Sequence, residues 1–406
     1  QPPDGNHLEE SGGDGGMKFT EYVEVNPKTN LKKGEYAPFV EMANVSITYR
    51  EPEKIEYKKY TSGPKFQNGD SVVARIEPCL QNGKRFFWKS DKIGFGSTEY
   101  IVFRAKEGKM DSKYLFYLLK TDYIKKSMVS SMVGATGRQR VNNDIFGQIE
   151  IVVPNIEKQK KIGRTLFLYD DLIENNQKQI KLLEEAAQRL YKEWFVDLNF
   201  PGHENTKIVD GVPEGWNWCK LEDAIQLDPK VTLTKERMKQ FIPMSALSTS
   251  SMVLDESQFA ETTSNSGSKF QNGDTLLARI TPCLENGKTA YVSGLKSDEG
   301  AVGSTEYIVM RAKTINSYMV YLLARTDDFR QSAINSMSGS DGRQRVKSDK
   351  LKMLDYLHPV SELVEKFENV AEPLFEKICK LSKQMQQAKQ ARDLLLPKLM
   401  SGEVEV

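Results

Sequence analysis

The residues of this chain most suited to chemistry are arginines and glutamines that occur twice in the same order. Thr136–Val141 reads TGRQRV, and Asp341–Val346 reads DGRQRV. Arginine can form paired hydrogen bonds with guanine or with phosphate, and glutamine can pair in the same way with adenine. The pattern therefore favours contact with a nucleic acid. A solvated turn whose arginines pair with nearby acids explains it equally well, because a duplicated structural turn is repeated too.

Other cations occur at matching places of a longer repeated run. Lys65–Lys84 reads KFQNGDSVVARIEPCLQNGK, and Lys269–Lys288 reads KFQNGDTLLARITPCLENGK. Cations at turns can position a protein on the phosphate backbone. The candidate DNA-binding residues from both patterns are Arg75, Lys84, Arg85, Arg138, Gln139 and Arg140 in the first copy, and Arg279, Lys288, Arg343, Gln344 and Arg345 in the second.

Residues suited to catalysis or metal binding are scarce. The chain has 3 histidines and 4 cysteines, with no CxxC pair that would indicate a zinc site. It contains no GxxxxGK[ST] phosphate loop and no GxSxG nucleophile turn. IGFGS at Ile93–Ser97 could suggest a glycine loop for a nucleotide or for S-adenosylmethionine, but the second copy reads AVGS there, so we interpret both as turns. We therefore predict that the chain is not an enzyme and holds no metal ion or cofactor.

Composition places the chain among globular proteins of ordinary charge. It has 406 residues and a net charge of +1, enough for roughly two to three domains. Residues 17–155 carry 23 Lys+Arg against 16 Asp+Glu, whereas residues 205–360 carry 19 of each, so the first region favours a polyanionic partner. Scattered cysteines fit a reducing cytoplasm, and no apolar run is long enough for a membrane span. Residues 1–16, acidic and rich in glycine, are interpreted as a disordered segment or a cloning remnant.

The repeats extend over most of the chain and indicate tandem duplication of a domain. KFTEYVEVNPK from Lys18 aligns with KLEDAIQLDPK from Lys220, and GSTEYIVFRAK from Gly96 with GSTEYIVMRAK from Gly303. Short runs rich in β-branched residues, such as SVVARI, are bounded by turn residues and predict strands. KYLFYLLKTD has helical spacing of its apolar residues. Each copy is therefore predicted to be a mixed domain of the α+β class.

A long heptad pattern follows each copy. Apolar residues recur at spacings of four and three, which is typical of a coiled coil. We predict two long helices that pair antiparallel; the alternative is that each helix packs only on its own domain. Pro373 should kink or delay the second helix. The predicted seam consists of Ile162, Leu166, Tyr169, Ile173, Asn176, Ile180, Leu183 and Leu190, and then Phe367, Leu374, Ile378, Leu381, Met385 and Leu395.

In this order, the motifs resemble the specificity subunit of type I restriction-modification enzymes from Met17 onward. The resemblance depends on the duplicated unit, GDxxxARI with its following GK turn, the YLFYLL-type helix, and GRQRV before a strand ending at Pro154. The heptad helix after each copy and the VPEGWNWCKLED run at Val212–Asp223 match as well. The first copy lacks the PEGW lead-in. A circular arrangement, with the SGEV tail (Ser401–Val404) near the N-terminus, would accommodate this difference.

The resemblance implies two target recognition domains that each read one half of a split DNA target, with the paired helices as a pseudo-twofold spacer. The expected domain order is residues 17–155 for the first target recognition domain, which we call the first copy, 156–200 for the central spacer helix, 201–360 for the second domain (the second copy), 361–400 for the distal spacer helix, and 401–406 for a tail.

The resemblance also implies partners that carry the chemistry. Two modification subunits would dock on the helices and methylate adenine with S-adenosylmethionine. Restriction subunits with ATP and Mg would act as motor and nuclease, all in the cytoplasm of a bacterium or archaeon. This chain would itself hold no cofactor and contact no membrane. Two alternatives stay open: a free-standing nucleic-acid-binding regulator, and a coiled-coil adaptor whose domains bind proteins.

Two segments differ most strongly between the copies. They are ANVSITYREPEKIEYKKYTSGP at Ala43–Pro64 and ALSTSSMVLDESQFAETTSNSGS at Ala246–Ser268. Residues common to both copies are expected to build the scaffold, so the differences would hold the sequence information. We expect base readout from these variable segments and phosphate positioning from the shared cations.

Overall fold

The computed structural model describes residues 16–340 and 343–406, so the segment interpreted as a remnant lies outside it except for Gly16. The chain forms two compact units. The first comprises the chain up to Asn175 together with Met385–Val406, and the second comprises Asn176–Gln384. Among the helices of the described residues, none combines the length and apolar character that a membrane crossing requires.

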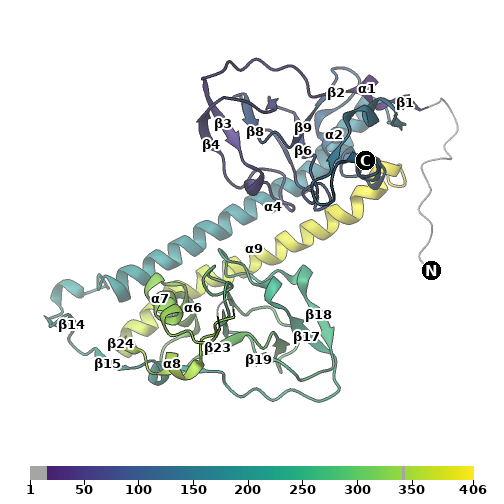
Figure 1. Cartoon of the computed structure of the whole chain (residues 1–406). Helices are drawn as coiled ribbons and strands as arrows, with labels where there is room; N and C mark the ends of the chain where they lie inside the picture. Colours follow the sequence, from purple (N-terminus) through teal and green to yellow (C-terminus); the bar gives the residue numbers. More distant parts are fainter. Residues whose placement is uncertain (1–15, 341–342) are drawn as a thin grey trace. The chain divides into compact units, whose positions relative to one another are not determined.

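The first copy is built on two four-stranded sheets, and several of their strands are labelled in Figure 1. One sheet is antiparallel throughout, and in the other only β3 and β8 run parallel. Val73 of the central strand β6 faces a core of helices, while Val72 faces a core between the sheets. The strand orders are β2 (Val23–Val25), β9 (Tyr100–Ala105), β6 (Ser71–Ala74), β7 (Arg85–Phe87), and β4 (Glu56–Lys59), β3 (Tyr36–Val40), β8 (Gly94–Gly96), β5 (Lys65–Phe66).

The second copy repeats both sheets strand for strand. Its second sheet again has a single parallel pair, β17 with β22. The predicted α+β class and the tandem duplication are thereby confirmed. The strand orders are β16 (Ile225–Leu227), β23 (Tyr307–Ala312), β20 (Thr275–Ala278), β21 (Thr289–Tyr291), and β18 (Ala260–Thr262), β17 (Lys239–Ile242), β22 (Ala301–Gly303), β19 (Ser268–Phe270).

Short helices cover one sheet of each copy. Asp111 and Asn316 cap the N-termini of the equivalent helices α2 and α6. Each side chain accepts a hydrogen bond from the backbone N–H three residues later, which would otherwise lack an acceptor. A two-stranded pair closes each copy: β1 with β12 in the first, and β15 with β24 in the second. The bounds are α1 (Phe19–Tyr22), α2 (Ser112–Leu118), α3 (Asp122–Ser130), α5 (Leu221–Ala224), α6 (Ser317–Arg325), α7 (Asp327–Asn335), α8 (Ser348–Lys352), β1 (Met17–Lys18), β10 (Met132–Val133), β11 (Arg140–Val141), β12 (Glu150–Ile151), β13 (Ile208–Val209), β14 (Val212–Pro213), β15 (Asn217–Lys220) and β24 (Asp355–His358).

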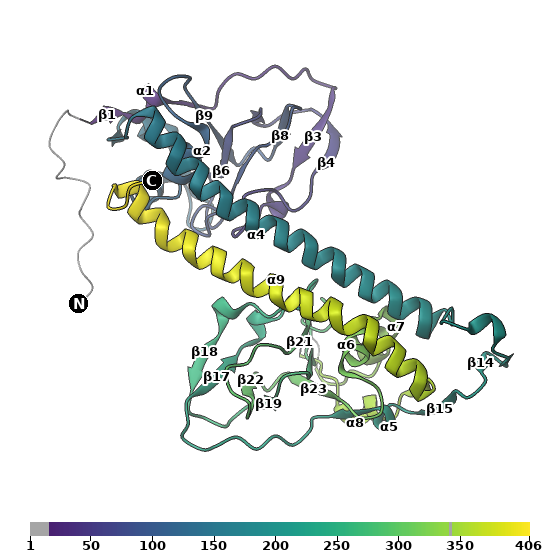
Figure 2. The ribbon, with the colours of Figure 1, turned by 180° about the vertical axis from the view of Figure 1, so that it is seen from behind.

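Two long helices, α4 (Ile156–Tyr191) and α9 (Ser361–Ser401), each contribute to both units. In the first unit, the start of α4 lies against the end of α9, and Ile162 shares a core with Leu399. In the second unit, the end of α4 lies against the start of α9, and the Tyr191 and Phe367 rings are in contact. The pairing is therefore antiparallel within each unit, as the two ribbons show in both views (Figures 1 and 2).

The predicted seam positions fall into two groups by burial. Leu166 and Phe367 are fully enclosed, and even the polar Asn176 is 2% exposed. The buried positions are Ile162, Leu166, Ile173, Asn176, Ile180, Phe367, Ile378, Leu381 and Met385, and the half-buried ones are Tyr169, Leu183, Leu190, Leu374 and Leu395.

Pro373 does not delay the second helix, so that expectation is wrong. Helix α9 begins at Ser361 and continues through Pro373 and Pro397 to Ser401. Proline removes one backbone donor and crowds the carbonyl four residues earlier. Both prolines are exposed, so water can bond the carbonyls they free. Buried neighbours such as Phe375, which is 2% exposed, hold the helix in place by packing.

A buried ion pair joins α4 to α9 in the first unit. Asp170 accepts a hydrogen bond from Arg392 at 2.5 Å, and the hydroxyl of Tyr117 donates to its other oxygen at 2.5 Å. Burial raises the pKa of Asp170, but Lys120 and Arg392 outweigh burial and hold the pKa below its usual value. The carboxylate thus stays charged in the core because cations surround it.

Replacing Arg392 by alanine should leave that carboxylate without its main partner and destabilise the first unit by about 3 kcal/mol. Urea denaturation of the full chain measures the change. Arg189→Ala is the matched control, because Arg189 is an exposed arginine of α4. Equal midpoints for the two variants would show that the pair contributes nothing to stability.

Candidate nucleic-acid interface

The second arginine of each GRQR run is held by a glutamate of the same copy. Arg140 donates to both oxygens of Glu99 at 2.7–3.0 Å, and Arg345 donates to both oxygens of Glu306 at 2.7–3.0 Å. The hydrogen bonds from Arg345 lower the pKa of Glu306. Each arginine thus fastens the GRQR turn to the loop that precedes β9 or β23.

The cations of the longer run bond main-chain carbonyls. Arg75 donates to the Val141 carbonyl at 2.8 Å, and Lys84 donates to the Met42 carbonyl at 2.8 Å. The second copy repeats both bonds, since Arg279 donates to Val346 at 2.7 Å and Lys288 to Met244 at 2.9 Å. These four cations therefore tie separate segments of the scaffold together.

Arg85 is placed where it cannot meet a ligand. It is 7% exposed and donates to the Leu119 carbonyl. Burial lowers the pKa of its guanidinium to about 10. Thr289 occupies the equivalent strand position in the second copy, so this cation is not part of the shared pattern.

The first arginine of each GRQR run is exposed and, unlike the second, is not held by a glutamate of the described residues. Arg138 and Arg343 are exposed, and their guanidinium groups bond no other residue of the described chain. Gln139 and Gln344 are half-buried, and their main-chain carbonyls accept from Glu77 and Thr281. The eleven candidates thus separate into scaffold cations and a smaller set available to a ligand.

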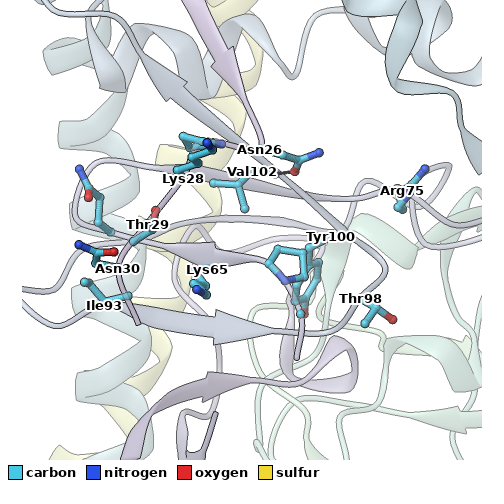
Figure 3. Close-up of a pocket in the computed structure, with 14 residues that line it drawn as sticks. Asn26, Lys28, Thr29, Asn30, Lys65, Arg75, Ile93, Thr98, Tyr100 and Val102 are labelled. Atoms are coloured by element: carbon cyan, nitrogen blue, oxygen red, sulfur yellow. Dashed lines mark hydrogen bonds between the residues drawn. The ribbon is translucent and has the colours of Figure 1, made fainter. Parts of the chain in front are cut away.

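A polar cleft lies beside Arg75 in the first copy. Its volume is about 870 Å³, and Lys28, Lys65 and Arg75 contribute three cations to its lining. Lys28 lies in the loop after β2, Lys65 on β5 and Arg75 directly after β6, and Figure 3 shows the three side chains among the residues that line the cleft. Asn26 stands at one side with φ of +51°, and its side chain accepts from the Val102 N–H at 3.1 Å. A polar, cationic hollow of this kind fits an anionic ligand.

Comparisons with known proteins support one family. Residues 23–185 match the family described as Type I restriction modification DNA specificity domain. The chain is 28% identical over 305 residues to the type I restriction enzyme MjaIX specificity subunit of Methanocaldococcus jannaschii, covering 73% of this chain and 69% of that protein. It is 35% identical over 140 residues to the EcoAI specificity subunit of Escherichia coli, covering 33% of this chain and 24% of that protein.

A solved structure agrees in fold. The S subunit of the type I restriction-modification system from M. genitalium has a TM-score of 0.57 at 14% identity, with 95% of each chain covered. Residues 23–185 match a type I restriction modification DNA specificity domain, and most of the chain is similar to type I specificity subunits. The resemblance inferred from the duplicated motifs is thereby confirmed.

Two cations of the cleft were not among the sequence candidates. Lys28 and Lys65 line the hollow, and their equivalents in the second copy are Lys230 and Lys269. Their identity between copies could have indicated them. Neither residue belongs to a GK turn or a GRQR run, and nothing in the sequence places the loop after β2 beside β5.

Each copy contains an ion pair with a buried aspartate at the NGD turn. Asp70 accepts two hydrogen bonds from Arg104 at 2.7–2.8 Å, and Asp274 accepts two from Arg311 at 2.6–2.7 Å. Asp70 also accepts the Gln67 N–H at 2.8 Å and so closes the NGD turn. Burial raises the pKa of Asp70 in spite of Arg104.

Asp70→Ala and Asp274→Ala should each destabilise their own unit by about 2 to 3 kcal/mol, because each leaves a guanidinium without its carboxylate partner and a turn N–H without an acceptor. Arg140→Ala and Arg345→Ala, which remove exposed ion pairs, should hardly move the unfolding midpoint. Urea denaturation of the four variants checks this. The reverse ranking would show that the GRQR turns, rather than the NGD turns, hold each copy together.

Proposed function

We propose that this chain is the specificity subunit, the non-catalytic DNA-reading part, of a type I restriction-modification complex, and that each copy reads one half of a split duplex target. What supports the proposal is the repetition of the same two sheets and the same cationic turns in one chain. A duplicated binding domain reads two sites, and the divergence of Ala43–Pro64 from Ala246–Ser268 gives the two copies different sequence preferences.

The helices α4 and α9 set the spacing between the half-sites. The 36 residues of α4 correspond to a length of about 54 Å at roughly 1.5 Å per residue. Each helix continues without a break from one unit into the other, and a continuous helix is a stiff spacer. The gap between the half-sites therefore follows from helix length rather than from a flexible linker.

The helices also dock the modification subunits, which methylate adenine with S-adenosylmethionine. Leu168 and Leu172, one turn apart on α4, are 59% and 44% exposed, and Leu182 is 64% exposed. Residues four apart share one helix face, and exposed apolar faces mark contacts with other proteins. Restriction subunits that use ATP and Mg complete the assembly, which acts in the cytoplasm.

The deciding experiment is single-molecule sequencing of the host genome for N6-methyladenine, with this gene intact and with it deleted. We expect deletion to abolish methylation at one split motif, two short half-sites around an unspecified gap. If the methylation pattern is unchanged while the modification genes are expressed, this chain does not direct an adenine methyltransferase, and a free-standing DNA-binding regulator or a protein adaptor becomes the better explanation.

Arg138→Ala and Arg343→Ala should weaken DNA binding alike for all sequences and lower the slope of log K against log salt by about 1 each. Their guanidinium groups are exposed and bond none of residues 16–340 and 343–406, so they can meet phosphates, whereas those of Arg140 and Arg345 are held by glutamates. Salt titrations with duplex DNA measure the slope, and Arg140→Ala and Arg345→Ala are the matched controls. A changed target sequence with an unchanged slope would instead assign Arg138 and Arg343 to base readout.

A further inference from the structure

The variable segment of each copy begins with a part that anchors the copy to α4. In the first copy, the backbone N–H of Arg50 donates to Glu174 at 3.0 Å, and its guanidinium also bonds that carboxylate. In the second, the backbone N–H of Met252 donates to Glu184 at 2.9 Å. Arg50 and Met252 are each 2% exposed. The sequence differences at this part are thus explained by the helix surface it meets, and a buried anchor cannot touch DNA.

The later part of each segment forms strand β4 or β18, and the sheet register aligns the two strands residue by residue. Phe39 pairs with Glu56, and its equivalent Phe241 pairs with Ala260. Counting along the sequence from these pairs makes Lys58 equivalent to Thr262, and Tyr60 equivalent to Ser264. The same count reaches Gly63 and Gly267 with no insertion in either copy.

The backbone beside these positions is fixed in both copies. Gly63 has φ of +110°, and a Cβ there would lie 2.3 Å from the Gly96 carbonyl oxygen. Gly267 has φ of +116°, and a Cβ there would lie 2.2 Å from the Gly303 carbonyl oxygen. Neither position can accept a side chain. The backbone at these glycines is therefore part of the shared scaffold, while the neighbouring side chains differ between the two copies.

In the first copy, this face is aromatic and cationic. Tyr60 packs edge-on against Phe95 with ring centres 5.2 Å apart, and Lys65 lies 4.9 Å above the Tyr60 ring. Lys58 lies 4.3 Å above the Phe39 ring and also pairs with Glu56 at 2.8 Å. Lys58 is exposed, and an exposed ion pair is exchanged for another acceptor at little cost.

In the second copy, the same face is hollow and carries hydroxyl groups. Val302 takes the place of Phe95 in the register with Phe241. A cavity of about 450 Å³ is lined by Phe241, Thr262 and Ser264 together with Gly267 and Gly303. The small side chains thus leave open the space that aromatic rings occupy in the first copy.

We infer that this face, formed by β4 in the first copy and β18 in the second, selects the bases of each half-site, with Lys58 and Tyr60 acting in one copy and Thr262 and Ser264 in the other. The inference rests on the proposed function. Lysine donates to guanine acceptors, serine and threonine hydroxyls bond either donors or acceptors, and the threonine methyl group can contact the thymine methyl group. The face also adjoins the cationic cleft of Figure 3, because Gly63 and Lys65 line that cleft.

The test uses the full chain assembled with its modification subunits and a pool of random duplex DNA, from which bound duplexes are sequenced. One variant combines Lys58→Thr with Tyr60→Ser, and a second combines Thr262→Val with Ser264→Ala. The matched control combines Lys126→Thr with Tyr123→Ser on α3, where both side chains are exposed. Far-UV circular dichroism checks that each variant is folded.

We expect the first variant to lose at least about tenfold of its base preference at one or more positions of one half-site. The other half-site should stay unchanged, and the second variant should show the opposite pattern. The control should enrich the wild-type motif. If the first variant fails to fold, the second decides, because its changes are small and lie at a hydroxyl-lined hollow.

Both half-sites unchanged in folded variants, or binding weakened equally for every sequence, would overturn the inference and leave the proposed function standing. A wild-type complex that enriches no split motif would overturn the proposed function and the inference with it. The result for the wild-type complex therefore distinguishes the two failures.

Discussion

Packing of α4 against α9 is the interaction on which both units depend. Neither helix can bury its seam by itself, since seam residues such as Ile173 and Ile378 are each almost fully enclosed. The end of α9 supplies Leu399 to the core of the first copy, although α9 follows the second copy in the sequence. Each unit is thus completed by a segment that is distant in the sequence, and loss of either helix would expose two cores rather than one.

Further contacts in each unit join the long helices to each other or to the copy. The first unit buries Asp170 with Arg392 and joins Arg50 to Glu174 at 2.7 Å, whereas the second packs Phe375 against tyrosine rings such as Tyr291 at 5.2 Å. Buried ion pairs add little net stability, but they penalise wrong partners heavily. The buried Asp170–Arg392 pair therefore disfavours any pairing of α4 with α9 that separates the two charges.

Much of the fold could be predicted from the sequence because its signals are local. Runs such as SVVARI, turns such as NGD, and the heptads of both helices specify elements from neighbouring residues, and duplication doubled each signal. The continuity of α9 through Pro373 could not be predicted in this way. It depends on tertiary packing, which overrides the local preference of proline when the freed carbonyl faces water.

The candidate site was less predictable, because the role of a cation depends on partners far away in the sequence. Arg138 and Arg140 are two residues apart and alike in type, yet Arg140 is held by Glu99 and Arg138 is exposed. The burial of Arg85 follows from the Leu119 carbonyl on another element. Repetition could identify these residues as important to the domain, but it could not separate scaffold from ligand contact.

Divergence between the copies is subject to the same difficulty. A position that differs between two copies of a domain has been freed from the scaffold, but it can differ because it meets DNA or because it meets another protein surface. Arg50 and Met252 differ because each is buried against its own part of α4. Lys58 lies over the Phe39 ring and Thr262 lines a cavity, both next to glycines whose backbone cannot change. A variable side chain on an invariant backbone is the arrangement that lets one fold read many sequences, since new specificity then requires no new scaffold.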